Sequence, residues 1–164
     1  MGNFISVYVR NSKESPSSYY RVIQYVQQID QRVVIHNALP ICLFRMNLDL
    51  RDGALKKMVQ AVLYGVILGR RLMSIIYDLI EKPSVIIIQR EVYPRWIPLI
   101  GRKLLGRLLQ QSEMIWDFDD DIFQGEISAC ETTMLQKYST IIVVTSDYLK
   151  SLLSVKSGYA SDYG

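Results

Sequence analysis

The segment SVIIIQREVYP, residues 84–94, joins an unbroken apolar run to a charged loop. No polar side chain interrupts Val85–Ile88, so a strand formed here would be buried on both faces. Such strands are typical of parallel sheets that helices cover on both sides. The segment therefore predicts a central parallel strand at residues 84–89, followed by a polar loop in which Pro94 sets the turn.

The rest of the chain alternates between strand-like and helix-like segments around this run. Four further strands are predicted at residues 4–10, 32–36, 113–118 and 139–145. Helices are predicted at residues 19–29, 54–81, 95–111, 127–138 and 146–155, and residues 37–52 are predicted to be irregular. This alternation predicts an α/β fold, a Rossmann-like doubly wound parallel sheet of about five strands with helices on both faces. The predicted strand order, numbered along the chain, is 3-2-1-4-5.

The longest apolar segment, residues 54–80, is predicted to form a well-buried amphipathic helix. Its apolar side chains recur at helical spacing, at Leu55, Met58, Val62, Val66, Met73, Tyr77 and Ile80. Lysines and arginines interrupt the segment, and the uncharged piece between Lys57 and Arg70 is too short to span a bilayer.

Length and composition indicate one folded domain. The chain has 164 residues, 49% of them hydrophobic, which is enough for a sizeable core. The two cysteines, Cys42 and Cys130, fit no metal or redox spacing, and no signal peptide is visible at the start, so we expect a cytoplasmic protein. Charge is uneven: residues 1–112 hold 16 Lys/Arg and 7 Asp/Glu, whereas residues 113–164 hold 3 and 9. The basic part suggests an anionic partner such as a phosphate group or a membrane surface, or else ordinary solvated helix faces.

Polar residues follow the predicted strands at their carboxyl ends, where open α/β sheets bind ligands. The first loop offers Ser17, Ser18, Tyr19 and Arg21, which suit a phosphate or carboxylate, or simply cap a helix. The loop after residue 89 offers Arg90, Glu91 and Tyr93, which could hold sugar hydroxyls or form a structural ion pair. The sequence contains neither GxGxxG nor GxxxxGK[ST], so no dinucleotide or triphosphate cradle is supported.

The segment IWDFDDDIF, residues 115–123, places four carboxylates behind an apolar strand. Three interpretations are open. Asp119 and Asp121 could bind Mg²⁺ or Mn²⁺. Asp117 and Asp119 could be the nucleophile and acid of a phosphatase. Otherwise Asp117, Asp119, Asp120 and Asp121 cap helices, pair with upstream basic residues, or bind acceptor hydroxyls without a metal. We expect Asp117 and at least one of the others to face a cleft, with Arg90 and Arg21 offsetting their repulsion.

These segments together resemble a known family. The ordered set is YYRV in the serine-rich loop, then VIIIQREVYPRWIP, MIWDFDDDIF and TIIVVTSDYLKSLL. It resembles the N-terminal half of glycosyltransferase family 4 and its relatives of GT-B fold, over about residues 4–153. Family members often show a Q-R-x-x-x-P loop after the third main strand and an acidic D-x-D-D-x-x-[FW] segment after the next. A strand then leads into an N/S-x-Y-L helix.

The resemblance implies an acceptor-binding domain at residues 1–155, with residues 156–164 as a tail. In this family a second Rossmann-like domain binds the nucleotide-sugar donor, and transfer needs no metal held by a D-x-D. No cofactor is therefore expected, and a metal site becomes the less favoured interpretation of the aspartates. The acceptor would be a glycan or lipid-linked molecule, as in polysaccharide biosynthesis, and no nucleic acid is expected. The acceptor-side candidates are Ser17, Ser18, Tyr19, Arg21, Arg90, Glu91, Tyr93, Asp117, Asp119, Asp120 and Asp121.

One departure concerns the donor domain, which in the family follows SDYLKSLL and carries an E-x₇-E motif. The given sequence ends at SVKSGYASDYG, so we expect an N-terminal half that does not catalyse transfer alone. An alternative is a haloacid-dehalogenase-like phosphatase using Asp117 and Asp119. Against it, the D-x-D motif of that family normally follows the first strand, and Asp121 stands where Thr or Val is usual. A third possibility is a non-catalytic sugar- or partner-binding module.

A membrane surface is a further expected partner. Arg95, Arg102, Lys103 and Arg107 lie on the predicted helix 95–111, with Trp96 near its start. Because family 4 enzymes often act on lipid-linked acceptors, this helix is a candidate membrane contact, and the alternative is a solvated helix face. Localisation is therefore expected to be cytoplasmic or peripheral at the membrane.

Overall fold

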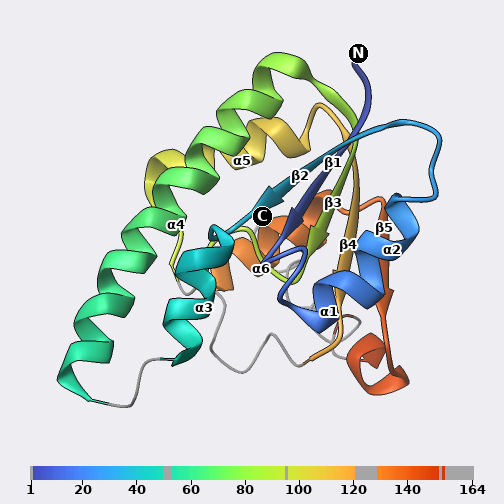
Figure 1. Cartoon of the computed structure of the whole chain (residues 1–164). Helices are drawn as coiled ribbons and strands as arrows, with labels where there is room; N and C mark the ends of the chain where they lie inside the picture. The colour runs from blue at the N-terminus through green and yellow to red at the C-terminus, as the bar shows by residue number, and fades with distance from the viewer. Residues whose placement is uncertain (1, 50–52, 95, 121–128, 152, 154–164) are drawn as a thin grey trace.

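Five parallel strands form the centre of the computed structural model, which describes residues 2–49, 53–94, 96–120, 129–151 and 153 (Figure 1). The strands are β1 (Gly2–Val9), β2 (Arg32–Asn37), β3 (Pro83–Gln89), β4 (Glu113–Phe118) and β5 (Ile141–Val144). Their order in the sheet is β2-β1-β3-β4-β5, and every neighbouring pair is parallel. The prediction of a Rossmann-like α/β fold with about five parallel strands is confirmed.

The predicted strand order, 3-2-1-4-5, is wrong. Instead β3 lies beside β1, where Ser6 is in register with Ile86. The chain between β2 and β3 contains α3 (Ile41–Asp49) and the 28-residue α4 (Ala54–Glu81). At about 1.5 Å per residue, α4 is long enough to carry the chain back across β1 before β3 begins. The order consequently reverses between β1 and β3, and in open α/β sheets this is where a ligand crevice forms.

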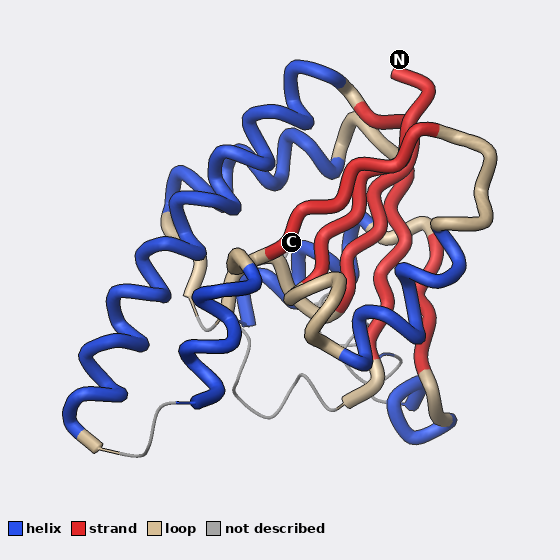
Figure 2. The backbone as a smooth tube through the Cα atoms, in the orientation of Figure 1, coloured by secondary structure: helices blue, strands red, loops and turns tan. Residues whose placement is uncertain are grey.

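Helices cover both faces of the sheet (Figures 1 and 2). One face packs against a single segment made of α1 (Pro16–Ser18), the π-helical η1 (Tyr19–Ile23) and α2 (Gln24–Val26), whose Val22, Ile23 and Val26 meet Ile5, Val7 and Val9. The opposite face meets α4, α5 (Leu99–Leu109) and α6 (Ala129–Tyr138). The larger core cluster lies on this second face and includes Tyr8, Ile86, Ile88, Met114, Trp116, Phe118, Leu105, Leu108 and Leu135.

Several helix boundaries differ from those predicted. α3 lies within residues 37–52, which were predicted to be irregular, because Pro40 starts a helix here rather than preventing one. α5 begins at Leu99 rather than at residue 95, because Pro98 is held in an extended conformation as its N-cap. Residues 147–151 are helical, in agreement with the prediction of a helix after β5.

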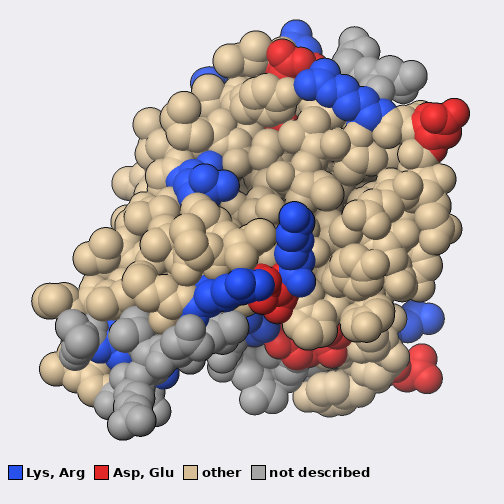
Figure 3. Space-filling model, in the orientation of Figure 1, with Lys and Arg blue, Asp and Glu red and all other residues tan. Residues whose placement is uncertain are grey.

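α4 packs on the sheet through a different face from the predicted one. Much of the predicted apolar stripe is exposed, namely Met58, Val62, Met73, Tyr77 and Ile80. The buried positions are Leu63, Arg71, Ile75 and Asp78. Apolar residues surround most of α4, so periodicity alone did not single out the packed face. Over Lys56–Glu81 the helix is long and apolar enough, by length and composition, to cross a membrane, although core helices pass the same test. Figure 3 shows few charged side chains over α4, on the left of the view.

Buried polar side chains connect α4 to the sheet. Asp78 accepts hydrogen bonds from the hydroxyl of Ser6 and from Tyr8 Oη, at 2.7 Å in the second case, and its other oxygen lies 3.1 Å from His36 Nε2. Arg71 donates to the carbonyl oxygens of His36 and Val9 at 2.8 and 2.9 Å. These bonds satisfy polar groups that would otherwise be costly to bury. They fix the rotation of α4 about its axis.

β5 is an edge strand. It pairs with β4 on one side, and among the described residues no strand pairs with its other side. Ile141 and Val143 point away from the core and are 53% and 42% exposed. The sheet therefore ends in a strand with an apolar outer surface.

Candidate functional site

A cleft of about 1140 Å³ opens at the carboxyl edge of the sheet, where the strand order reverses between β1 and β3. α3 and the N-terminal half of α4 extend past the strand ends (Figure 2). Side chains of both helices line one side of the cleft. The loops after β1, β3 and β4 form the rest. The polar side chains that line the cleft are Arg10, Ser15, Ser17, Ser18, Lys57, Gln60, Arg71, Gln89, Arg90, Glu91, Asp119 and Asp120.

Ser17, Gln89 and Asp119 form a hydrogen-bonded chain at one end of the cleft. Gln89 Nε2 donates to Ser17 Oγ at 3.0 Å, and this hydroxyl donates to Asp119 Oδ2 at 2.9 Å. The three residues come from β3, α1 and the loop after β4, so the topology assembles them. Asp119 is exposed, and its second oxygen remains available to accept a hydrogen bond from a ligand.

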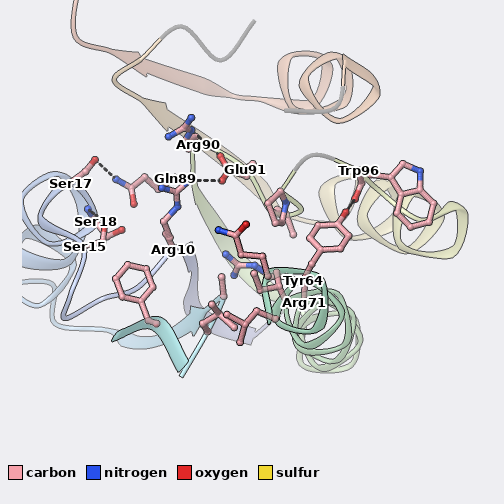
Figure 4. A pocket seen from close by; sticks show the side chains of 18 of the residues that line it. Arg10, Ser15, Ser17, Ser18, Tyr64, Arg71, Gln89, Arg90, Glu91 and Trp96 are labelled. Atoms are coloured by element: carbon pink, nitrogen blue, oxygen red, sulfur yellow. Dashed lines mark hydrogen bonds and ion pairs between the residues drawn. The ribbon is translucent and has the colours of Figure 1, made fainter. Parts of the chain in front are cut away.

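Arg90 forms an ion pair with Asp120, the second aspartate that lines the cleft. Arg90 Nη1 lies 2.9 Å from Asp120 Oδ2, and Arg90 Nε lies 3.1 Å from Glu91 Oε2. Arg10 approaches the other oxygen of Glu91 at 3.5 Å. Burial raises the pKa of Glu91, while Arg10 and Arg90 act in the opposite direction. Figure 4 shows Arg10, Arg90 and Glu91 meeting in the middle of the cleft.

Asp117 and Arg21 form an ion pair beside the cleft rather than in it. Arg21 Nε donates to Asp117 Oδ2 at 2.9 Å, and Arg21 Nη2 donates to Asp117 Oδ1. Asp117 is 5% exposed, and burial raises its pKa although Arg21 lowers it. Both carboxylate oxygens thus have a partner within the protein. The expectation that Asp117 faces the cleft is therefore wrong, because Asp117 is buried against Arg21. The expected pairing of Arg21 and Arg90 with aspartates is confirmed by Arg21–Asp117 and Arg90–Asp120.

The loop that carries Arg90 is held by β4 and α6. Arg90 adopts a left-handed backbone conformation, with φ at 67°, which is uncommon for a residue with a side chain. Its N–H donates to the carbonyl of Asp117 at 2.7 Å, and its own carbonyl accepts from Trp116 Nε1 at 2.9 Å. The fully buried Glu131 of α6 accepts from the N–H groups of Val92 and Tyr93. Burial raises the pKa of Glu131 to about 8, although these hydrogen bonds lower it.

The predicted site residues divide into two groups. Ser17, Ser18, Arg90, Glu91, Asp119 and Asp120 line the cleft together. Arg21 and Asp117 pair next to it, Tyr19 is 42% exposed and stacks edge-on against Tyr20, and Tyr93 is fully buried. Asp121 lies outside the described residues. Among the residues that the structure describes, no group of three or more His, Cys, Asp or Glu side chains could hold a metal ion.

Sequence analysis missed Arg71, Gln89 and Arg10 as cleft residues. Arg71 was assigned only as an interruption of an apolar helix, yet it is 1% exposed and lines the cleft. A usable signal was the spacing of Arg71 and Asp78, which places two opposite charges on one face of α4. Gln89 was read as the end of a strand, and Arg10 likewise, although both stand at the carboxyl edge where ligands bind.

Comparison of the chain with protein-family models, with curated proteins and with solved structures finds no match. The fold and the geometry of the cleft are therefore the observations from which a function is argued.

Proposed function

We propose that this chain is the acceptor-binding half of a GT-B-type glycosyltransferase, which transfers a sugar from a nucleotide-sugar to a glycan or lipid-linked acceptor. The observation that carries the proposal is the cleft at the point of strand reversal, where Ser17, Gln89, Asp119 and Arg90–Asp120 converge from three strand ends. The motifs QREVYP and DFDDD supply most of these residues. They are the motifs on which the resemblance to family 4 rests.

The chemistry of the cleft suits a polyhydroxylated ligand. Sugar hydroxyls both donate and accept hydrogen bonds, and the cleft offers carboxylate acceptors at Asp119 and Asp120 beside donors at Arg90 and Gln89. In the proposed reaction an acceptor hydroxyl oxygen forms a bond to the anomeric carbon of the donor sugar. The bond from that carbon to the nucleotide diphosphate breaks, the diphosphate leaves with the electron pair, and the hydroxyl proton is released. The donor would be held by a second domain, so this half alone is expected to transfer no sugar.

A binding experiment tests the proposal. Methyl glycosides of glucose, mannose, galactose and N-acetylglucosamine would be titrated against the labelled protein and followed by NMR. At least one should shift the resonances of Ser17, Gln89 and Asp119, with millimolar affinity, and UDP-glucose should bind poorly or not at all. Asp119→Asn should weaken glycoside binding about tenfold, as expected for one hydrogen bond to a charged group. Glu113→Gln, an exposed change at the amino end of β4, is the matched control. Absence of glycoside-induced shifts in the cleft would contradict the proposal.

The phosphatase alternative would use Asp117 as nucleophile. In the structure both oxygens of Asp117 are occupied by Arg21, which does not favour attack on a phosphoryl group. Mg²⁺-dependent hydrolysis of a generic phosphomonoester, abolished by Asp117→Asn, would establish this alternative. The third possibility, a non-catalytic sugar-binding module, shares the same cleft and differs only in whether a donor-binding domain exists.

A membrane surface belongs to the same proposal as a partner. Trp96, Leu99 and Ile100 are 57%, 76% and 60% exposed at the start of α5. The exposed basic residues Arg102, Lys103 and Arg107 follow on this helix, while Arg95 lies outside the described residues. Apolar and basic side chains side by side suit the interface of an anionic bilayer. Trp96 also lines the cleft, so this surface adjoins its opening.

A further inference from the structure

The cleft changes in character along its length (Figure 4). Ser15, Ser17 and Ser18 lie at one side of the view, and Tyr64 and Trp96 lie at the opposite side. Arg10, Glu91 and Arg71 lie between them. A ligand that fills the cleft would therefore meet hydroxyls and carboxylates first, then cationic groups, and then aromatic side chains.

Arg71 is a buried cationic group in the wall of the cleft. Its side chain is 1% exposed, its two terminal nitrogens donate to the backbone carbonyls of His36 and Val9, and its guanidinium lies over the ring of Tyr8, 5.4 Å from the centroid. Among the described residues no carboxylate lies within ion-pair distance of it, and its buried Nε has no hydrogen-bond partner. A buried charge is normally paired, so an anion is the missing partner at this wall of the cleft. Burial lowers the pKa of Arg71 to about 10, which still leaves it charged at neutral pH.

Arg10 supplies further donors beside Arg71 in the middle of the cleft, and Ser18 supplies one at the serine side. Arg10 is half exposed and touches Glu91 only at 3.5 Å, so most of its five N–H donors face the cleft or solvent. Ser18 lines the cleft and is 1% exposed, and its buried hydroxyl has no hydrogen-bond partner among the described residues. Buried hydroxyls and guanidinium N–H groups without partners are suited to the oxygens of a phosphate.

The part of the cleft lined by α3 and α4 is mostly apolar. Its apolar lining is Ala38, Leu39, Phe44, Ala61, Leu63, Tyr64, Ile67 and Trp96, and Lys57 and Gln60 of α4 lie among them. Tyr64 Oη donates to the carbonyl of Trp96 at 2.7 Å, which holds the loop before α5 against α4. The apolar end adjoins the exposed Leu99 and Ile100, so a chain that leaves it would reach an apolar surface.

We infer that the cleft binds a lipid-linked phosphate, with its hydroxylated headgroup at Ser17 and Asp119, its phosphate at Arg71 and Arg10, and its apolar chain between α3 and α4. This inference names the acceptor class of the proposed function and rests on it for the identity of the headgroup as a sugar.

Alkyl phosphates test the inference. Inorganic phosphate and butyl, octyl and dodecyl phosphate would be titrated below the concentrations at which they form micelles, with binding followed by calorimetry and NMR. Affinity should rise with chain length, by up to roughly fourfold for each methylene that enters the apolar end. Dodecyl phosphate should bind more than a hundredfold more tightly than inorganic phosphate. Equal binding of the two would indicate a site for free phosphate and overturn the inference.

Two pairs of variants locate the site. Arg10→Gln should weaken dodecyl phosphate binding about tenfold, whereas Arg32→Gln, which removes an exposed arginine at the opposite end of the sheet, should not. Ile67→Asn in the cleft should abolish the dependence on chain length, whereas Ile80→Asn on the outer surface of α4 should preserve it. Arg71→Lys is a further variant, used only if its thermal unfolding matches the wild type. Equal effects within each pair would show adsorption to the surface and overturn the inference.

The two proposals fail in distinguishable ways. Dodecyl phosphate binding that depends on Arg10 and Ile67, without any glycoside binding, supports the lipid-phosphate site and contradicts the sugar-acceptor function. Glycoside binding that depends on Asp119, without alkyl phosphate binding, leaves the proposed function standing and overturns this inference.

Discussion

Arg21 in the π-helical turn and Asp117 at the end of β4 form a two-point ion pair across 96 positions of sequence. Their side chains are 19% and 7% exposed, so the pair is largely withdrawn from water. It attaches the helical segment α1–η1–α2 to the strand that precedes the aspartates. The pair therefore fixes the serine loop relative to Asp119 and Asp120, although neither Arg21 nor Asp117 lines the cleft.

The stability losses from removing each partner alone should add up to more than the loss from removing both. Arg21→Met leaves a buried carboxylate without a counter-charge, and we expect a loss of about 3–5 kcal/mol in the free energy of unfolding. The double variant Arg21→Met/Asp117→Leu should lose less than the sum of the two single variants, because neither charge then remains unpaired. Urea unfolding measures all three. Strict additivity of the single effects would show that the ion pair contributes no coupling.

The raised pKa of Glu131 predicts that stability falls as pH rises. Glu131 titrates near pH 8 when folded and near its ordinary value of 4.5 when unfolded. Between these values the folded chain holds a proton that the unfolded chain has released, so its contribution is greatest below pH 4.5 and lost by about pH 8. Glu131→Gln keeps an oxygen acceptor for Val92 and Tyr93 and should reduce this slope. Burial also raises the pKa values of Glu91 and Asp117, so some slope remains.

The measurement is the midpoint of urea unfolding from pH 5 to pH 9. Glu113→Gln serves as the control, because it removes an exposed carboxylate and should leave the slope unchanged. Parallel curves for wild type and Glu131→Gln would contradict the raised pKa.

Two glycines of α5 should respond oppositely to alanine. A Cβ atom at Gly101 would lie 2.8 Å from Tyr93 Oη, and Tyr93 is fully buried, so Gly101→Ala should cost about 1–3 kcal/mol of stability. At Gly106 the nearest atom is Met134 Cε at 3.4 Å, the end of a flexible side chain. Gly106→Ala should be neutral or stabilising by up to about 1 kcal/mol, through helix propensity. Thermal unfolding distinguishes them, and equal effects would contradict the packing of Tyr93 on α5.

The basic surface of α5 should bind anionic vesicles. Replacing Arg102, Lys103 and Arg107 together by Gln should weaken binding to phosphatidylglycerol-containing vesicles by at least tenfold, at about 1 kcal/mol for each charge near the surface. The control replaces Lys82, Lys137 and Lys150 by Gln, which changes net charge equally but on other elements. Vesicle co-sedimentation measures both. Binding unaffected by the α5 variant would remove this helix as the membrane contact.

Much of the fold could be predicted because strand character is local. The apolar runs within residues 84–89, 113–118 and 139–145 predicted strands of a parallel sheet, although the last of them, β5, proved to be a half-exposed edge strand. Strand order depended on the path of α4, which sequence does not encode locally. The packed face of α4 was mistaken for a similar reason. Its buried positions include Arg71 and Asp78, whose hydrogen bonds to β1 and β2 form only once the sheet exists.

Site residues that directly follow a strand could be predicted from the sequence. Site residues that reach the cleft from α4 could not. Arg90, Asp119 and Asp120 follow β3 and β4, and the rule that ligands bind at carboxyl ends placed them together. Arg71 and Tyr64 reach the cleft from α4, which approaches from the side because of the long crossover. No local pattern marks such residues before the topology is known.

The apolar outer edge of β5 bears on how the protein behaves in concentrated solution. Among the described residues no strand pairs with the outer side of β5, and its Ile141 and Val143 side chains are exposed. Such an edge is a template on which another strand can add. Self-association should therefore grow with protein concentration and begin at this strand rather than at the cleft. Val143→Lys should raise solubility and leave ligand binding in the cleft unchanged. Light scattering across a concentration series would measure the self-association.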